Sequence, residues 1–239
     1  MKAVILAGGI GTRMRPLTYV VPKAMLPVGG KPLLERTIQH LKSYGFREFV
    51  VCVAYLKRQI MDAFGDGSKL GVAISYAEAE SPLGTGGQLK TAERFVQDAF
   101  LAMNGDIVTS LNIHNFVRTH QEHSAIATVA VKKFEVKIPY GYITLAEDFT
   151  IRNFEEKPTL TFTANAGVYV FEPRIFRYIP EGSVVSLETE TFPALMKKGE
   201  KMNSYYEDVY WADVGSMSDF ERVNNELLSE TVSVAGRLE

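Results

Sequence analysis

The stretch Lys2-Ala3-Val4-Ile5-Leu6-Ala7-Gly8-Gly9-Ile10-Gly11-Thr12-Arg13 begins as an apolar run and ends in a glycine-rich turn. The apolar part predicts a buried strand, and a strand that delivers such a turn at its carboxyl end is typical of nucleotide sites in open α/β sheets. Glycines let backbone N–H groups approach a phosphate closely. Arg13 and, after Pro22, Lys23 add positive charge. The segment therefore predicts a protein that binds a polyphosphate.

Two alternatives apply to the glycines taken alone. A ligand-free turn between a strand and a helix has the same composition, and the dinucleotide fingerprint is incomplete because Met14 stands where its third glycine belongs. The lysine of a P-loop does not follow the turn either. The neighbouring basic residues favour phosphate binding over a plain turn.

Composition limits the classes of protein to consider. The chain has 239 residues, of which 46% are hydrophobic, so we expect one domain over residues 1–239. A net charge of −2 does not favour nucleic acid as a partner. Cys52 is the only cysteine, which excludes an internal disulfide. We see no signal peptide and no apolar run that could span a bilayer, so we expect a cytoplasmic protein without a membrane partner.

Strand and helix patterns alternate in the first half of the chain, which predicts a mainly parallel sheet covered on both faces. The predicted strands are 4–7, 48–54, 72–77 and 100–103, and the predicted helices are 32–45, 56–64 and 86–95. Four strands with short connections follow, at 125–131, 141–145, 151–154 and 166–171. They predict an antiparallel portion that forms a wall of the cleft. Helical periodicity returns at 188–198 and 217–228.

Five further motifs follow the opening turn in order: Leu83-Gly84-Thr85-Gly86-Gly87, Asn104-Gly105-Asp106, Glu156-Lys157-Pro158, Asn165-Ala166-Gly167 and Trp211-Ala212-Asp213-Val214-Gly215. With the opening turn they resemble the sugar-1-phosphate nucleotidyltransferases, also called NDP-sugar pyrophosphorylases. The pattern is most similar to mannose-1-phosphate guanylyltransferase-like members without a C-terminal β-helix. The resemblance implies an α/β, Rossmann-like, mainly parallel mixed sheet. Residues 1–124 would mainly bind the nucleotide and residues 125–239 mainly the sugar phosphate.

The resemblance also implies a reaction in which an NTP and a sugar 1-phosphate give an NDP-sugar and pyrophosphate. Arg13 would lie along the triphosphate, and Lys23 would lie between the donor and acceptor phosphates; a surface ion pair is the alternative for each. The expected nucleotide contacts are Leu6, Ala7, Gly8, Gly9, Gly11, Thr12, Arg13, Lys23, Glu78, Glu80, Gly84, Thr85 and Gly86.

Asp106 and Asp213 are the carboxylates that the resemblance assigns to a Mg²⁺ ion. Mg²⁺ prefers one or two carboxylates together with phosphate oxygens and water. With Arg13 and Lys23, these two aspartates complete the expected catalytic set. Taken alone, Asp106 also reads as a turn residue after Asn-Gly, and Asp213 as a helix cap ahead of Ser216.

The sugar side is expected to hold the acceptor phosphate and the sugar hydroxyls. The resemblance assigns the phosphate to Lys157 and the hydroxyls to Glu156, whereas composition alone also fits a solvated charge cluster at the end of a strand. The full expected set on this side is Asn104, Gly105, Gly141, Glu156, Lys157 and Asn165.

The segment Tyr76–Pro82, beside the expected base site, contains two carboxylates and no glutamine. A carboxylate suits the two adjacent donors of guanine, so the sequence favours GTP with mannose 1-phosphate or a related sugar phosphate. Ala79 occupies the position that aligns with the residue that reads the base in the family. Side chains alternate along an extended segment, which places Glu78 and Glu80 on one face. UTP or dTTP with glucose 1-phosphate, a non-catalytic NDP-sugar-binding regulator and a glycosyltransferase remain as alternatives, and a homodimer is left open.

Overall fold

The centre of the computed structural model is a seven-stranded mixed sheet, and the structure describes residues 1–229 and 232. In spatial order its strands are β12 (Met202–Tyr206), β8 (Ala127–Lys137), β11 (Thr159–Phe171), β6 (Phe100–Asn104), β1 (Ala3–Leu6), β4 (Glu48–Val53) and β5 (Ala73–Glu78). β1 pairs in parallel with β4 and β6, and β4 pairs in parallel with β5. β11 runs antiparallel to both β6 and β8. The predicted α/β fold with an antiparallel portion is confirmed.

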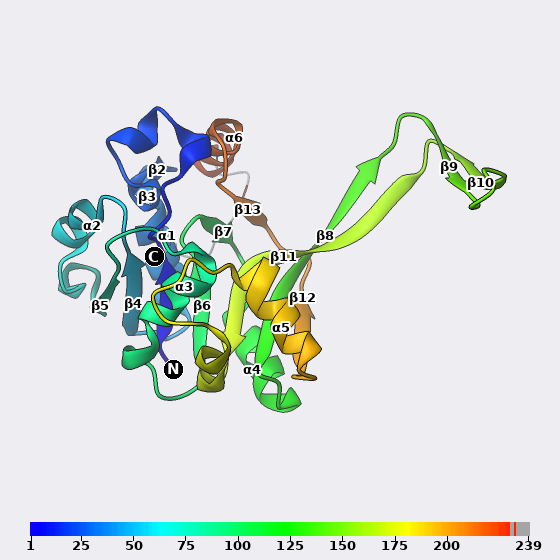
Figure 1. The fold of residues 1–239 in the computed structure, drawn as a ribbon. Helices are drawn as coiled ribbons and strands as arrows, with labels where there is room; N and C mark the ends of the chain where they lie inside the picture. Colours follow the sequence, from blue (N-terminus) through cyan, green and yellow to red (C-terminus); the bar gives the residue numbers. More distant parts are fainter. Residues whose placement is uncertain (230–231, 233–239) are drawn as a thin grey trace.

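Helices cover both faces of this sheet (Figure 1). They are α1 (Leu33–Ser43), α2 (Lys57–Phe64), α3 (Gly84–Thr91), α4 (Ile113–His123), α5 (Phe192–Lys197) and α6 (Met217–Leu228). Ile38 of α1, Ile60 of α2 and Phe116 of α4 belong to one apolar cluster. Leu89 of α3 and Leu195 of α5 belong to a second cluster. All of β1 is buried, because a parallel strand at the centre of such a sheet is covered on both sides.

The path of the chain creates a crevice at one end of the sheet. From β1 the chain passes through α1 to β4 and through α2 to β5, and α3 then returns it to β6 on the opposite side of β1. The strand order therefore reverses between β1 and β6. In open α/β sheets, ligands bind outside the carboxyl ends of the strands at such a reversal. The glycine-rich turn after β1 and the Asn104-Gly105-Asp106 motif after β6 both lie there.

In α1 the local sequence determines both the buried face of the helix and the residue at which the helix ends. Leu34, Ile38 and Leu41 recur at helical spacing and are buried, so one face of the helix packs on the sheet. The helix ends before Gly45, whose φ of 87° is the left-handed conformation that glycine adopts easily. The helix predicted between 32 and 45 is confirmed.

β8 and β11 are much longer than the predicted strands 125–131 and 166–171. Their pairing continues outward from Val131 opposite Asn165 to Lys137 opposite Thr159. A separate two-stranded sheet, β9 (Gly141–Leu145) with β10 (Ile151–Glu156), lies at the outer end. We call residues 132–165 the arm; Figure 1 shows it extending away from the rest of the chain, in green. In this chain the arm does not form the wall of the cleft that the sequence predicted.

Several elements escaped the sequence prediction. α4 is amphipathic, with Ile113, Phe116 and His120 buried. Two short pairs, β2 (Pro27–Val28) with β3 (Lys31–Pro32) and β7 (Ile107–Thr109) with β13 (Trp211–Asp213), were also missed. The helix predicted at 188–198 is a π-helical turn, Leu187–Thr191, followed by α5. Among the described helices, none combines the length and apolar character needed to cross a membrane.

Candidate active site

Lys23, Asp106 and Asp213 meet at the carboxyl end of the central strands. The Lys23 Nζ lies 2.5 Å from Asp106 Oδ2 and 4.0 Å from Asp213 Oδ1. Lys23 opens the 3₁₀ helix Lys23–Met25, directly after Pro22. Asp106 follows β6, and Asp213 is the last residue of β13. Three segments that are distant in sequence therefore contribute one charge each to a single cluster.

The pairing of β7 with β13 explains why the two aspartates are neighbours. Asp213 lies opposite Ile107 in this antiparallel pair. One residue further along, the Val214 N–H donates to the Asp106 carbonyl oxygen over 3.0 Å. The indole N–H of Trp211, at the start of β13, donates to the Ala166 carbonyl over 2.8 Å and fixes the strand against β11. Main-chain pairing thus sets the separation of the carboxylates.

Arg13 joins this cluster through Gly215. A Cβ built on Gly215 would lie 3.0 Å from an Arg13 guanidinium nitrogen and 3.0 Å from Asp213 Oδ2. The guanidinium therefore packs against bare backbone beside the Asp213 carboxylate. Gly11 has a similar relation to Lys23, since a Cβ at Gly11 would lie 3.3 Å from the Lys23 Cβ. The structure thus brings together Arg13, Lys23, Asp106 and Asp213, the four residues of the predicted catalytic set.

The electrostatics of Asp213 fit a bound cation. Burial, and then the neighbouring charge of Asp106, raise the pKa of Asp213, while Lys23 and Arg13 act in the opposite direction. Asp213 Oδ1 is buried and has no hydrogen-bond partner among the described residues, and the same holds for Asn104 Oδ1. An orphaned carboxylate oxygen beside a second carboxylate is a donor set of the hard oxygens that Mg²⁺ prefers.

Asp106 and Asp213 are the two carboxylates that this cluster offers to a metal ion. Within residues 1–229 and 232, no three His, Cys, Asp or Glu side chains are placed to share one metal ion. Two carboxylates could hold a Mg²⁺ ion only together with phosphate oxygens and water. These residues therefore fit a cation that arrives with a nucleotide.

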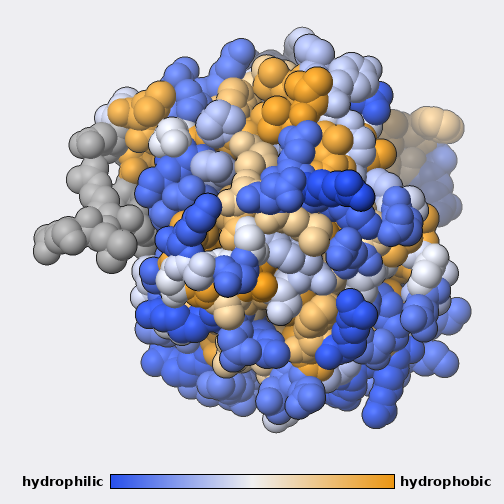
Figure 2. Space-filling view, turned by 90° about the vertical axis from the view of Figure 1, so that its left-hand side faces the viewer, coloured by the Kyte–Doolittle hydropathy of each residue, from blue (hydrophilic) through white to orange (hydrophobic). Residues whose placement is uncertain are grey.

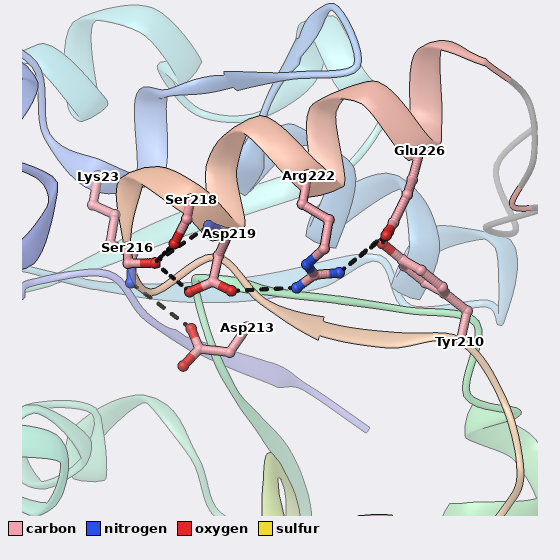
Figure 3. A network of polar contacts seen from close by, with 8 residues as sticks. All are labelled: Lys23, Tyr210, Asp213, Ser216, Ser218, Asp219, Arg222 and Glu226. Atoms are coloured by element: carbon pink, nitrogen blue, oxygen red, sulfur yellow. Dashed lines mark hydrogen bonds and ion pairs between the residues drawn. The ribbon is translucent and has the colours of Figure 1, made fainter.

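The contacts at the start of α6 exclude one alternative for Asp213. Ser216 is the N-cap of α6: its hydroxyl accepts the Asp219 N–H at 3.2 Å and donates to Asp219 Oδ2 at 2.6 Å (Figure 3). Arg222 continues the chain of contacts from Asp219 to Glu226. Asp213 is therefore not the helix cap, and Figure 3 shows its carboxylate pointing toward Lys23.

A cavity of about 150 Å³ lies beside the charged cluster. It is lined by Leu6, Ala7, Gly9, Lys23, Ala24, Thr85, Gln88, Asn104, Gly105 and Asp106. Sequence reasoning missed Gln88, a buried side chain whose Oε1 accepts the Gly8 N–H at 2.8 Å. Its position directly after the Leu83–Gly87 motif, on α3, was the signal that could have found it. The Gly8 N–H is therefore already bound inside the protein.

The Gly84-Thr85-Gly86 turn packs against another part of the chain. A Cβ at Gly84 would lie 2.5 Å from the Val185 carbonyl oxygen, and the Gly86 N–H donates to that oxygen at 2.8 Å. The Thr85 hydroxyl donates to Glu188 Oε2 at 2.7 Å. Glycines here allow the start of α3 to lie against the segment before α5. Of the three residues, only Thr85 lines the cavity.

Asn165 connects to the same region through a buried tyrosine. Its amide donates to the Tyr169 hydroxyl at 2.7 Å, and Tyr169 donates to Glu188 Oε1 at 3.1 Å. Burial, and then Glu188, raise the pKa of Tyr169, so this hydroxyl stays protonated and keeps donating. Tyr169 and Glu188 were not expected from the sequence. They link Asn165, which the sequence predicts on the sugar side, with Thr85, which it predicts on the nucleotide side.

Glu78 and Glu80 lie together at the end of β5. Both pair with Lys57, with N···O distances of 3.3 Å from Glu78 and 2.8 Å from Glu80. The predicted alternation, with both carboxylates on one face, is therefore confirmed. The hydrogen bond and charge of Lys57 lower the pKa of Glu80. Neither glutamate lines the cavity beside Asp106.

Gly141, Glu156 and Lys157 lie at the outer end of the arm. Gly141 pairs with Glu156 across β9 and β10, and a Cβ at Gly141 would meet the Glu156 carboxylate at 3.1 Å. Lys157 has a φ of 50°, and its N–H donates to the Tyr140 carbonyl at 3.3 Å. Figure 1 shows this end of the arm far from β1 and β6. The structure therefore does not bring these three residues to the cluster around Lys23 within one chain.

The sequence is similar to known proteins over nearly its whole length. The family profile described as nucleotidyl transferase matches residues 2–230. A UTP–glucose-1-phosphate uridylyltransferase of Synechocystis is 34% identical, covering 97% of this chain and 64% of the relative. A mannose-1-phosphate guanylyltransferase of Mycobacterium tuberculosis is 35% identical, covering 95% of this chain and 65% of the relative. The chain thus spans less than two thirds of the length of these relatives.

Solved structures are similar as well. A Bacillus anthracis protein, provisionally named as a glucose-1-phosphate thymidylyltransferase, superposes with a TM-score of 0.78 at 25% identity, covering 95% of both chains. HddC of Yersinia pseudotuberculosis, solved with GMP-PN, gives a TM-score of 0.75 at 24% identity, covering 94% of this chain and 98% of HddC. The latter likeness concerns the fold alone. The chain therefore belongs to the nucleotidyl transferase family.

Proposed function

We propose that this protein transfers a nucleotidyl group from an NTP to a sugar 1-phosphate, giving an NDP-sugar and pyrophosphate. An oxygen of the sugar phosphate forms a bond to the α-phosphorus of the NTP. The bond between that phosphorus and the oxygen bridging to the β-phosphorus breaks, and pyrophosphate leaves with its electrons. The observation that carries the proposal is the meeting of Arg13, Lys23, Asp106 and Asp213 at the strand-order reversal.

Catalysis requires the anionic sugar phosphate to approach the anionic triphosphate. The positive charges of the cluster would reduce the repulsion between them. Lys23 lies at the centre and would neutralise the oxygens around the α-phosphorus. Arg13, held against Gly215, would lie along the departing pyrophosphate. Such fixed cations stabilise developing negative charge without reorganisation during the reaction. The glycine-rich turn would bring backbone close to the triphosphate.

We further propose that Asp106 and Asp213 hold a Mg²⁺ ion. The orphaned Oδ1 of Asp213 and the proximity of both carboxylates to Lys23 support this assignment. When bound, Mg²⁺ supplies Lewis-acid polarisation of phosphate oxygens. Lys23 now binds Asp106 directly, so it would turn toward phosphate as the metal and nucleotide arrive.

The proposed acceptor is mannose 1-phosphate or a related sugar phosphate, and the proposed donor is GTP. The similarity to a mannose-1-phosphate guanylyltransferase supports GTP, and Glu78 or Glu80, which now pair with Lys57, would accept from the two adjacent donors of guanine. On the acceptor side, Asn104 and Gly105 would border the sugar phosphate from the cavity wall, with Asn165 behind them. Lys157 would hold the phosphate and Glu156 the hydroxyls.

UTP with glucose 1-phosphate is the second candidate pair. It is favoured by the Synechocystis relative and by Gln88, whose amide belongs to the cavity wall. Because the Gln88 Oε1 already accepts the Gly8 N–H, its amide NH2 would donate to a carbonyl oxygen of uracil.

Pyrophosphate release, measured with GTP, UTP, dTTP and ATP against mannose, glucose and heptose 1-phosphates in Mg²⁺, tests the function. We expect the highest kcat/KM for GTP with mannose 1-phosphate. Activity with UTP alone would contradict the choice of base while keeping the reaction. No turnover with any pair, despite NDP-sugar binding by calorimetry, would replace the enzyme with a binding protein.

A further inference from the structure

The arm exposes an unusual amount of apolar side chain. Phe149 is 82% exposed, Tyr140 75%, Ile151 62% and Phe154 59%. Further exposed apolar residues of the arm are Val136, Tyr142, Ile143, Leu145, Leu160 and Phe162. Exposed apolar side chains gathered on one segment favour a site of interaction with another macromolecule.

The outer sheet of the arm also lacks support of its own. β9 and β10 form a sheet of two strands, and every residue of β10 is exposed. A two-stranded sheet is marginally stable in water, and its free edges can pair with further strands. A surface that covers the outer sheet would therefore stabilise it.

Contacts at the base of the arm direct the arm away from the rest of its own chain. The Lys132 ammonium donates to the Val209 carbonyl at 3.1 Å, and the Phe134 ring packs edge-on against Trp211, with centroids 5.9 Å apart. From Val131 opposite Asn165 to Lys137 opposite Thr159, the paired strands extend by about 20 Å. Lys157 lies just before the outer end of β11, so this pairing holds it at the outer end of the arm.

We infer that the arm docks on a second copy of this chain and delivers Lys157 and Glu156 to the site of that copy. The inference rests on the proposed function, because Lys157 of the arm is the one cation among the residues expected on the sugar side. The exchange is reciprocal: each copy gives its arm and receives the other. A reciprocal exchange related by a twofold axis leaves no arm and no receiving surface unpaired, so the assembly is a dimer.

The receiving surface would lie beside the nucleotide turn. Val20 is 67% exposed and Tyr19 58% exposed, in the segment that joins Arg13 to Lys23. The Gln59 amide donates to the Val20 carbonyl at 2.9 Å, which holds this segment in place. In Figure 2, apolar side chains gather at the upper edge of the face, where this segment lies in Figure 1. An apolar arm on this surface would place its lysine next to the cavity.

Sedimentation velocity tests the docking without relying on activity. We expect the wild-type chain to sediment as a dimer and the double variant Phe149→Glu/Phe154→Glu as a folded monomer. Met196→Glu, which changes an exposed apolar residue of α5, is the control and should remain dimeric. A wild-type monomer at every concentration, an arm variant that stays dimeric, or a monomeric control would overturn the proposal.

A heterodimer tests the delivery of Lys157. Two differently tagged chains, one Lys157→Ala and one Asp106→Ala, are co-expressed and the mixed dimer is isolated. With exchanged arms, one of its two sites has both residues, so about half of the wild-type rate is expected although each parent is inactive. An inactive heterodimer would mean that each arm serves its own chain. If Lys157→Ala alone retained its sugar-phosphate KM, the proposed role of Lys157 would fail, whereas sedimentation would still decide the docking.

Discussion

Asp106 and Asp213 both lie near one ammonium group, that of Lys23, at 2.5 and 4.0 Å. The pairing of β7 with β13 sets this relationship, because it fixes the Val214 N–H on the Asp106 carbonyl. The ammonium of Lys23 forms an ion pair with each of the two carboxylates. The same geometry would accept a divalent cation once the lysine moves to a phosphate.

The first prediction concerns both carboxylates as metal ligands. Asp106→Asn and Asp213→Asn should each lower kcat by about 100-fold or more, because the metal would lose half of its protein ligands. Asp208→Asn, which changes an exposed aspartate, is the matched control and should keep the wild-type rate. Steady-state pyrophosphate release in Mg²⁺ measures this. Near-normal rates in both aspartate variants would exclude the assignment.

The second prediction is that Asp213→Asn stabilises the metal-free protein. Burial and Asp106 raise the pKa of Asp213, so its carboxylate is held less favourably in the folded chain than in the unfolded one. The ionised Asp213 therefore lowers the free energy of unfolding. This loss of stability is fully present above the raised pKa and vanishes below the ordinary pKa of an aspartic acid. Thermal melts in EDTA should therefore show a higher Tm for the variant at pH 7 and equal values in strong acid.

The same thermal melts, repeated with Mg²⁺, test whether the metal binds through Asp213. Mg²⁺ should raise the Tm of the wild-type chain and leave that of Asp213→Asn nearly unchanged, because a ligand stabilises only the state that binds it. A variant that is less stable at pH 7 without metal, or that gains as much from Mg²⁺ as the wild type, would contradict this reading of Asp213.

The third prediction concerns Lys23. Lys23→Met leaves two close carboxylates without the neighbouring ammonium, so the variant should be less stable than wild type at pH 7. Added Mg²⁺ should raise its Tm more than that of the wild type. Lys31→Met, which removes an exposed pair with Glu35, is the control and should change little. Equal losses in both variants would mean that Lys23 is an ordinary surface charge.

The fourth prediction separates two roles for glycine. A Cβ at Gly87 would lie 2.5 Å from the Ser183 carbonyl oxygen, so Gly87→Ala should cost about 1–3 kcal/mol of stability. A Cβ at Gly9 would meet nothing within 4 Å, in the space proposed for the triphosphate. Gly9→Ala should therefore keep its Tm and raise the KM for NTP. Thermal melts and initial rates measure both effects. If Gly87→Ala kept its Tm and raised the KM for NTP while Gly9→Ala lost stability, the roles assigned to the two turns would be wrong.

The sequence predicted the sheet well where burial is complete. The apolar run of β1 and the helical spacing of Leu34, Ile38 and Leu41 each indicate one structure, so both elements were found. The short strands β7 and β13 carry no such periodicity, because their pairing depends on chain segments distant from each other. The outer parts of β8 and β11 expose both faces, so no alternation of buried and exposed residues marked their length.

For the site, the motifs identified residues more readily than their surroundings. Arg13, Lys23, Asp106 and Asp213 were found and lie together. Gln88 was missed because a single glutamine on a helix carries no signal until the fold places it against Gly8. The separation of Lys157 from the cluster could not be foreseen either, since the direction of the arm is set by tertiary contacts at its base.

A crystal structure with a non-hydrolysable NTP analogue and Mn²⁺, read by anomalous scattering, tests the central claim most directly. Mn²⁺ accepts the same oxygen ligands as Mg²⁺ and can be located without ambiguity. The account predicts an anomalous peak within about 2.3 Å of oxygens from both Asp106 and Asp213, next to the α-phosphate, with Lys23 turned toward phosphate. A metal bound elsewhere, with Lys23 still paired to Asp106 beside the nucleotide, would contradict it.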